Sequence, residues 1–331
     1  MGTVVNIETG SDSTSLENLS NLTSSDLVEV NKLIVKCMDS TVELIPQLAG
    51  HIVAAGGKRI RPMMTLAAAR LCGYEGSRHI ALAACVEFIH TATLLHDDVV
   101  DESNYRRGYF SINAIWKNKY SVLIGDYLLS SGLTFSLEND DFKFLKVLSN
   151  SVKEMSEGEI IQMKKSKSLD LDEELYFKII EKKTASLFVA CCEMCSISSS
   201  KNIKEISKLK ELGLNLGLAF QIKDDLFPYI DSDSGKPISN DILQKKLTLP
   251  IIYSINKSSY SEKKRVLNAI KEKRDVEYIL NFVKKMGGVD YSIQKINFYI
   301  QNSIKIIDNF KSSKYKSAFY ILIDFLSNRK K

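Results

Sequence analysis

The chain has 331 residues, and its 45 Lys and Arg against 40 Asp and Glu give a formal net charge of +5. That charge is too small to indicate a nucleic-acid-binding protein, but it is compatible with small anionic substrates. The six cysteines lack the spacing of a disulfide framework, and Cys192 and Cys195 have no second pair or histidine cluster to complete a zinc site. We expect the cysteines to pack in the core of a protein from a reducing, cytoplasmic compartment.

Residues 1–25 are rich in Ser, Thr, Asn and acidic side chains and lack the basic start and apolar run of a signal peptide, which predicts a disordered tail. Glu87 and His90 interrupt the apolar stretch 80–95, so we expect no membrane span. From residue 26 to residue 331, apolar residues recur at three-to-four spacing and prolines are rare, which predicts one all-α domain. The predicted helices span 27–46, 61–72, 78–102, 111–137, 141–165, 172–198, 203–227, 247–257, 261–272, 275–286, 291–309 and 314–328.

Two of these helices contain segments, 80–95 and 213–222, that are apolar on nearly every side, which predicts positions at the centre of a helical bundle. Both segments lead directly into acidic pairs. Clustered carboxylates beside an apolar interior are costly unless cations compensate them. The sequence therefore predicts a cation-binding site at the ends of two central helices.

The first acidic cluster is Asp97-Asp98-Val99-Val100-Asp101. On a helix, Asp97 and Asp101 lie on one face about one turn apart, while Asp98 points roughly 100° away. Carboxylate ligands without Cys or His at zinc-like spacing favour Mg²⁺ shared with substrate phosphates. The alternative for an isolated motif of this kind is a solvated acidic helix end.

A second cluster strengthens the metal hypothesis, because Asp224 and Asp225 follow their own apolar helix and could face the first cluster across a cavity. Arginine forks and mobile lysine charges bind phosphate oxygens. Each basic group alone could equally be solvated surface, but together with the carboxylates they suit a diphosphate. The candidate phosphate-binding residues are Lys58, Arg59, Arg61, Arg106, Arg107, Lys183 with Thr184, Lys236 and Lys246.

These motifs resemble those of the trans-isoprenyl diphosphate synthase family, in particular its bacterial long-chain, octaprenyl-like members, and they follow the family's order and spacing across about residues 27–255. The resemblance rests on Gly57-Lys58-Arg59-Ile60-Arg61-Pro62, Leu95-His96-Asp97-Asp98-Val99-Val100-Asp101 with Arg106-Arg107-Gly108, Gly125-Asp126-Tyr127-Leu128-Leu129, Glu157-Gly158-Glu159, Lys183-Thr184-Ala185, Phe220-Gln221 with Asp224-Asp225, Gly235-Lys236-Pro237 and Lys246-Leu247-Thr248-Leu249-Pro250.

The resemblance implies an isoprenoid-synthase helical bundle that ionises an allylic diphosphate, adds isopentenyl diphosphate and loses a proton. It implies a cluster of about three Mg²⁺ ions bound with the allylic diphosphate. Asp97, Asp101 and Asp224, with Asp225 beside them, would hold these ions, and Lys58, Arg61, His90 and Arg107 would hold isopentenyl diphosphate without metal. The allylic diphosphate would be held by Arg106, Lys183, Thr184, Gln221, Lys236 and Lys246.

Two histidines need separate interpretations. A lone histidine on an apolar helix is more often a core residue than a ligand, but His90 lies shortly before the acidic helix end, which favours substrate binding. His96 is expected to be structural or to support the site.

The second acidic motif departs from the family pattern, because Pro228 occupies the position where an aspartate is usual. Asp231 lies seven residues beyond Asp224, about 10 Å further along a helix, which is a poor substitute. We expect activity with an altered affinity for the third ion. An inactive partner subunit of a heteromeric enzyme stays open as an alternative.

Product length is predicted from the residues before Asp97, which would form the wall of a passage for the growing chain. Ala92 and Thr93 lie about 6–7.5 Å below the metals and are small, so the next obstructions on this helix are Phe88 and Ile89. We expect a product longer than C20, although Ala92 could instead simply permit close helix packing. A shorter C15–C20 product is the alternative.

Other functions are less compatible with the residues. A class I terpene cyclase needs no pocket for a second diphosphate, which Lys58, Arg61 and Arg107 argue against, and a squalene-type synthase has different acidic motifs. The resemblance further implies a homodimer and a product destined for quinone side chains.

Overall fold

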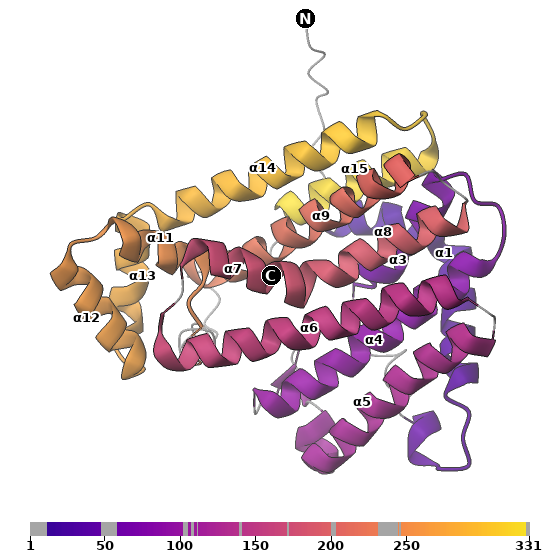
Figure 1. The fold of residues 1–331 in the computed structure, drawn as a ribbon, viewed down its shortest axis with the longest axis horizontal. Helices are drawn as coiled ribbons and strands as arrows, with labels where there is room; N and C mark the ends of the chain where they lie inside the picture. The colour runs from indigo at the N-terminus through magenta and orange to yellow at the C-terminus, as the bar shows by residue number, and fades with distance from the viewer. Residues whose placement is uncertain are drawn as a thin grey trace, which may run out of the picture.

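The computed structural model describes residues 12–47, 58–101, 105–106, 109–110, 112–138, 141–170, 172–199, 203–230, 244 and 246–328. Within this part of the chain the elements are helical (Figure 1), apart from two short antiparallel strands, β1 (Tyr105–Arg106) and β2 (Tyr109–Phe110). The all-α prediction is confirmed. The helices are α1 (Asp12–Cys37), α3 (Ile60–Leu71), α4 (Arg78–Val100), α5 (Ile112–Glu138), α6 (Phe142–Ser168), α7 (Glu173–Ile180), η1 (Glu181–Ala185), α8 (Ser186–Ser198), α9 (Ile203–Ile230), α11 (Leu249–Lys257), α12 (Tyr260–Lys271), α13 (Val276–Lys285), α14 (Gly288–Asp308) and α15 (Lys314–Asn328).

The expected disordered tail is wrong for the residues from Asp12 onward, because α1 begins there. Leu19 is 1% exposed and Thr23 is 2% exposed, and α1 packs against α15 and α4. A polar composition concealed an apolar stripe at helical spacing, which continues through Val30 and Ile34. Burial of that stripe holds the helix on the bundle. The expectation for residues 1–11 lies outside the described residues.

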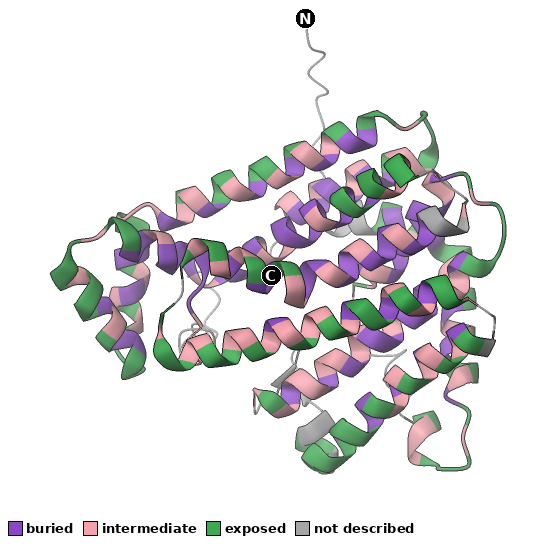
Figure 2. Ribbon diagram, in the orientation of Figure 1, coloured by how far each residue is buried: buried purple, intermediate pink, exposed green. Residues whose placement is uncertain are grey.

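Helix α4 occupies the middle of the bundle and packs against α1, α3, α5, α6 and α8. By length and composition α4 is apolar enough to cross a membrane, but 56% of its most apolar window is buried inside the protein. Figure 2 shows the general pattern, with buried residues on the helix faces that meet other helices and exposed residues on the outer faces. An apolar helix of this kind has its hydrophobic partners within the fold.

Glycines bring the helices around the site unusually close together. A Cβ on Gly217 of α9 would lie 2.6 Å from Ala185 Cα, and one on Gly158 of α6 would lie 2.8 Å from the backbone N of Lys183. Both contacts meet η1, a single π-helical turn, and such turns are frequent at functional sites. The glycines therefore place Lys183 and Thr184 between α6 and α9.

Helix α9 continues through Pro228 to Ile230, whereas the sequence placed its end at residue 227. Leu226, Phe227 and Tyr229 are buried on either side of the proline. Their packing stabilises the last turn although proline removes one helical hydrogen bond.

The expectation that the cysteines pack in the core is confirmed for five of them, while Cys37 is half-buried. All six are free thiols; Cys192 and Cys195 are fully buried, and burial raises the pKa of both thiols well above the ordinary value. Thiols of this kind are structural and poorly reactive.

Candidate active site

The ends of α4 and α9, the middle of α6, η1 and the segment at Lys246 meet at one region of the bundle. Asp97 on α4 and Asp101, which caps that helix, are half-buried, whereas Asp98 is 3% exposed and points into the protein. This difference agrees with the expected helical geometry, in which Asp98 faces away from the other two carboxylates.

Two lysines from distant elements compensate the carboxylates of α4. Lys246 Nζ lies 3.0 Å from Asp101 Oδ2, across 145 residues of sequence. Lys183 forms an ion pair with Glu159 of α6. Burial lowers the pKa of Lys183, but Asp97, Glu159 and Asp101 together outweigh it and leave that pKa raised. Lys183 therefore favours its charged form through its ion pair with Glu159 and the nearby charges of Asp97 and Asp101.

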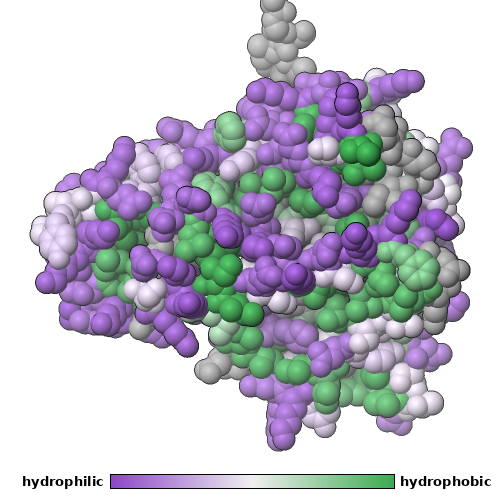
Figure 3. Space-filling view, viewed as in Figure 1, coloured by the Kyte–Doolittle hydropathy of each residue, from purple (hydrophilic) through white to green (hydrophobic). Residues whose placement is uncertain are grey.

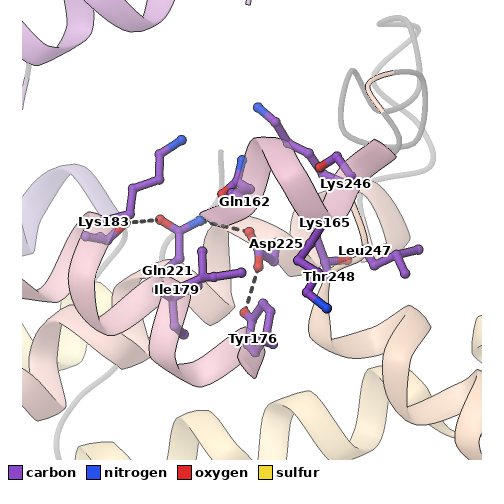
Figure 4. Close-up of a pocket in the computed structure, with 13 residues that line it drawn as sticks. Gln162, Lys165, Tyr176, Ile179, Lys183, Gln221, Asp225, Lys246, Leu247 and Thr248 are labelled. Atoms are coloured by element: carbon purple, nitrogen blue, oxygen red, sulfur yellow. Dashed lines mark hydrogen bonds between the residues drawn. The ribbon is translucent and has the colours of Figure 1, made fainter. Parts of the chain in front are cut away.

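The second acidic cluster is joined to η1 by a chain of side-chain hydrogen bonds (Figure 4). Thr184 Oγ1 donates to Gln221 Oε1 at 2.7 Å, and Gln221 Nε2 donates to Asp225 Oδ1 at 2.8 Å. Tyr176 on α7 donates its hydroxyl proton to Asp225 Oδ2 at 2.7 Å. Because Lys183 and Thr184 are neighbours, η1 connects the carboxylates of α4 with those of α9.

A cavity of about 110 Å³ opens beside this chain of hydrogen bonds. Its lining is mixed, with cationic, amide and hydroxyl groups on some sides and aliphatic side chains on others. The lining residues are Gln162, Lys165, Ser166, Tyr176, Ile179, Ile180, Lys183, Thr184, Gln221, Asp225, Lys246, Leu247 and Thr248.

Arg61 and His90 form a separate polar pair. Arg61 Nη1 lies 3.0 Å from His90 Nε2, and the guanidinium carbon lies 4.9 Å from the centre of the Phe188 ring and 5.7 Å from that of Phe220. Stacking on aromatic rings and one hydrogen bond hold the guanidinium plane, which suits an arginine that receives an anion. The pairing places His90 beside a cation rather than among apolar side chains alone.

The two basic residues just before Arg61 in the sequence, Lys58 and Arg59, contact other side chains. Lys58 is exposed, with its ammonium group 5.1 Å from the centre of the Phe325 ring. Arg59 has a left-handed backbone conformation with φ of 47° and forms an ion pair with Glu87. The turn before α3 therefore directs Arg59 into a structural contact.

The remaining predicted residues are only partly described. Asp224 is half-buried on α9 next to Asp225. Arg106 lies in β1, where the backbone alone is described, and Arg107 and Lys236 lie outside the described residues. His96 Nε2 lies 3.3 Å from the carbonyl oxygen of Val122 and 3.4 Å from Asp126 Oδ1, so it contacts α5.

Three of the four residues predicted to limit product length lie in two hydrophobic clusters, and the fourth, Thr93, lies outside both. Phe88 and Ala92 pack with Met38, directly after α1, and with Leu128 of α5, whereas Ile89 belongs to the main core. Thr93 Oγ1 donates to the carbonyl oxygen of His90 at 2.9 Å. Phe88 and Ala92 are four residues apart and share one face of α4, and Ile89 and Thr93 share the neighbouring face.

The sequence interpretation did not identify Tyr176 and assigned no role to Glu159. Tyr176 precedes Lys183 by seven residues, which places both on one side of a continuous helix. That spacing was a signal for Tyr176. Glu159 contacts the site through the fold, because its partner Lys183 belongs to another helix.

The donor set fits a hard divalent cation. Within the described ranges, no group of three or more His, Cys, Asp and Glu side chains is close enough to hold a metal by itself. Carboxylates are nevertheless presented by α4 and α9, with two lysines among them. Hard cations that keep only one or two protein ligands complete their coordination with water and substrate phosphates. The residues fit that kind of site.

Comparison with known proteins identifies the family. Residues 42–286 match the polyprenyl synthetase family model. The chain is 36% identical to octaprenyl diphosphate synthase of Escherichia coli over 92% of this chain and 95% of that one. A crystal structure of a Rhodobacter capsulatus decaprenyl diphosphate synthase superimposes with a TM-score of 0.87 at 35% identity, covering 93% of this chain and 98% of that one.

A polyprenyl synthase from Caulobacter crescentus CB15, solved with calcium and isoprenyl diphosphate, superimposes with a TM-score of 0.88 at 36% identity, over 98% of this chain and 99% of that one. The expected all-α isoprenoid-synthase fold is thus confirmed. The acidic helix ends and the lysines beside them agree with this likeness. The chain belongs to the polyprenyl synthetase family and is a prenyltransferase of the polyprenyl diphosphate synthase type.

Proposed function

We propose that this enzyme is a long-chain trans-polyprenyl diphosphate synthase that adds isopentenyl diphosphate to an allylic diphosphate with Mg²⁺. The observation that carries the proposal is the bridging position of η1. Lys183 faces the carboxylates of α4, and Thr184 bonds Gln221 beside the carboxylates of α9. One allylic diphosphate can contact both clusters at this position.

In the proposed reaction, Asp97, Asp101 and Asp224 hold about three Mg²⁺ ions together with the allylic diphosphate. When bound, the ions act as Lewis acids that stabilise the negative charge of the departing diphosphate. Lys183 and Lys246 add fixed positive charge to the same group, and preorganised charge is a large contribution to catalysis. The resemblance also places Asp225 beside the ions, but its two oxygens accept hydrogen bonds from Gln221 and Tyr176.

The second substrate, isopentenyl diphosphate, is assigned to Arg61 and His90, with Lys58 and Arg107 as further contacts. The carbon–oxygen bond of the allylic diphosphate breaks first, and diphosphate leaves with the bonding electrons. The double bond of isopentenyl diphosphate then attacks the allylic cation to form the new carbon–carbon bond, and loss of a proton restores a double bond. Apolar side chains exclude water, which would otherwise trap the cation.

A product of octaprenyl length is proposed on two grounds. The chain is similar to an octaprenyl diphosphate synthase over nearly its whole length, and the small Ala92 lies shortly before Asp97. Other relatives carry names from geranylgeranyl to nonaprenyl diphosphate synthase, so likeness alone does not select the length. Use of the product for quinone side chains and a cytoplasmic location are part of the proposal.

A homodimer is also proposed. Helix α5 has a row of exposed apolar side chains, including Val122, Leu123 and Leu137, of which Leu123 is 65% exposed. Figure 3 shows hydrophobic surface over this part of the molecule. Exposed apolar patches on a soluble fold are typical of interfaces between proteins.

The test is incorporation of radiolabelled isopentenyl diphosphate with geranyl, farnesyl or geranylgeranyl diphosphate and Mg²⁺. Dephosphorylated products separated by chain length should peak near eight isoprene units, the length that the likeness favours. A C15–C20 product would contradict the long-chain proposal. No incorporation by the purified chain would instead support a subunit of a heteromeric synthase. A 27% identical relative from Bacillus subtilis is named heptaprenyl diphosphate synthase component 2, which is compatible with that alternative.

A further inference from the structure

The second acidic motif contains two adjacent aspartates with different surroundings. Asp224 is half-buried, while Asp225 is 7% exposed. Both oxygens of Asp225 accept hydrogen bonds within the protein, from Gln221 Nε2 at 2.8 Å and from the Tyr176 hydroxyl at 2.7 Å. Figure 4 shows Asp225 between these two side chains. A carboxylate held in this way is oriented by α7 and by its own helix.

We infer that Asp225 is a positioning residue and not a metal ligand, and that Tyr176 and Asp225 together orient Gln221 and Thr184 toward the allylic diphosphate. The inference rests on the proposed function for the identity of the substrate. It assigns a role to Tyr176, and it separates the two aspartates of the motif.

The direction of the hydrogen bonds determines the orientation of Gln221. An ionised carboxylate can only accept, so the NH₂ group of Gln221 must face Asp225 and its carbonyl oxygen must face Thr184. Thr184 then donates its only hydroxyl proton to Gln221, and the lone pairs of Thr184 Oγ1 remain as acceptors. Asp225 thus determines which polar atoms of Gln221 and Thr184 are available to a ligand.

One donor remains for a ligand. Among the residues that the structure describes, the second N–H of Gln221 Nε2 has no acceptor, and Gln221 lines the cavity with Lys183 and Lys246. A diphosphate oxygen in this cavity would meet that N–H together with two ammonium groups. Charge-assisted hydrogen bonds of this kind are short and strong.

Tyr176 connects the second acidic motif to helix α7. It reaches Asp225 from α7, at a distance of 49 residues along the chain, and is 3% exposed. The contact lies one turn before Pro228, where α9 lacks a backbone donor. Tyr176 therefore holds the carboxylate in place near a locally weakened helix end.

The test compares Tyr176→Phe, Asp225→Ala and Asp224→Ala in the full-length enzyme. Tyr176→Phe removes only the hydroxyl, and it should raise KM for the allylic diphosphate about 3–10-fold, with KM for isopentenyl diphosphate unchanged. Asp225→Ala should raise the same KM by more. Neither should change the Mg²⁺ concentration for half-maximal activity at saturating substrate, whereas Asp224→Ala should raise it at least about tenfold.

Tyr291→Phe is the matched control, because the Tyr291 hydroxyl donates to Glu173 Oε1 at 2.6 Å at the start of the same helix α7, and neither residue lines the cavity. Its kinetic constants should equal those of the wild type. Isothermal titration of an unreactive allylic thiodiphosphate with Mg²⁺ gives a second readout, in which Tyr176→Phe should weaken binding by the same factor. In the double variant Tyr176→Phe/Asp225→Ala, the tyrosine change should add nothing, since both act through Gln221.

Two results would overturn the inference. A rise in the Mg²⁺ requirement of Asp225→Ala equal to that of Asp224→Ala would make Asp225 a ligand. Wild-type binding and KM in Tyr176→Phe would remove its positioning role. If the wild-type chain binds the thiodiphosphate but transfers no prenyl group, the proposed function fails, and the titrations still decide the roles of Tyr176 and Asp225.

Discussion

Lys246 Nζ lies 3.0 Å from Asp101 Oδ2 and thereby joins the end of α4 to the segment that leads into α11. Both residues are predicted to bind the same diphosphate. Asp101 would bind it through a metal ion, and Lys246 would bind it directly through its positive charge. In the protein without ligand, the ammonium group compensates the carboxylate. A bound cation and diphosphate would separate the pair and give each group its own partner.

Removing Lys246 is expected to weaken the binding of the allylic diphosphate. Lys246→Ala should raise KM for the allylic substrate about 10–100-fold, because a hydrogen bond to a charged group contributes roughly 1.5–3 kcal/mol. Lys246→Arg should recover part of the loss. Steady-state kinetics with each substrate varied in turn is the measurement, and an equal rise in KM for isopentenyl diphosphate would contradict the assignment.

Changes at Arg61 and His90 should affect the other substrate. His90→Ala removes the partner 3.0 Å from Arg61 Nη1 and leaves the aromatic rings under the guanidinium in place. KM for isopentenyl diphosphate should rise about 3–10-fold, with KM for the allylic diphosphate unchanged. The control is Arg59→Lys at the neighbouring position, whose partner is Glu87. If His90→Ala left both KM values unchanged, the histidine would be a core residue.

Ala92→Phe tests the wall that limits product length. Ala92 is 1% exposed and packs with Met38 and Leu128, so the larger ring must displace them or enter the passage for the product. We expect a shorter product, measured by chromatography of dephosphorylated products, together with a stability loss of about 1–3 kcal/mol from overpacking. Ala92→Val should give an intermediate length. A destabilised enzyme with unchanged product length would show that Ala92 serves helix packing alone.

Gly158 should tolerate no side chain, because a Cβ there would lie 2.8 Å from the backbone N of Lys183. Gly158→Ala is expected to push η1 away from α6, to lower stability by about 1–3 kcal/mol and to reduce kcat. Gly132→Ala on α5 is the matched control, since its Cβ would meet atoms at 3.7 Å. Alanine in that helix should raise stability by up to about 1 kcal/mol. Thermal unfolding and turnover of both variants check the pair, and equal behaviour would contradict the close approach.

His79 should make stability depend on pH. Burial lowers its pKa below the ordinary 6.5 more strongly than the hydrogen bond to Asp26 raises it, and Arg70 also lowers it. The unfolded chain then binds the proton more readily, so the contribution is complete above about pH 6.5 and is lost as the pH falls through the folded-state pKa. His79→Gln should therefore have a smaller fall in apparent Tm between pH 7.5 and pH 5.5.

The size of that effect has an upper limit, because one proton changes the free energy of unfolding by at most about 1.4 kcal/mol per pH unit. Asp26, Arg70, Tyr74 and Ser77 are the groups around the ring. Circular dichroism melts at several pH values are the measurement. Parallel pH profiles for the wild type and His79→Gln would refute the prediction.

Much of the fold followed from local patterns. Apolar residues at helical spacing predicted the long helices, and two uniformly apolar segments that end in carboxylates predicted the central helices and their acidic ends. The periodicity also determined that Asp98 faces away from Asp97, since helix geometry is local. The same method failed at α1, where polar composition outweighed the buried stripe through Leu19.

Tertiary structure decided which groups share the site. The pairing of Lys246 with Asp101 spans 145 residues, and that of Tyr176 with Asp225 spans 49. Spacing along the chain cannot predict such contacts, because they depend on how close the helices pack, which here is set by glycines such as Gly158 and Gly217. The sequence by itself determined the helices and the chemistry of their ends, whereas the packing of those helices decided that one aspartate faces a lysine and another a tyrosine.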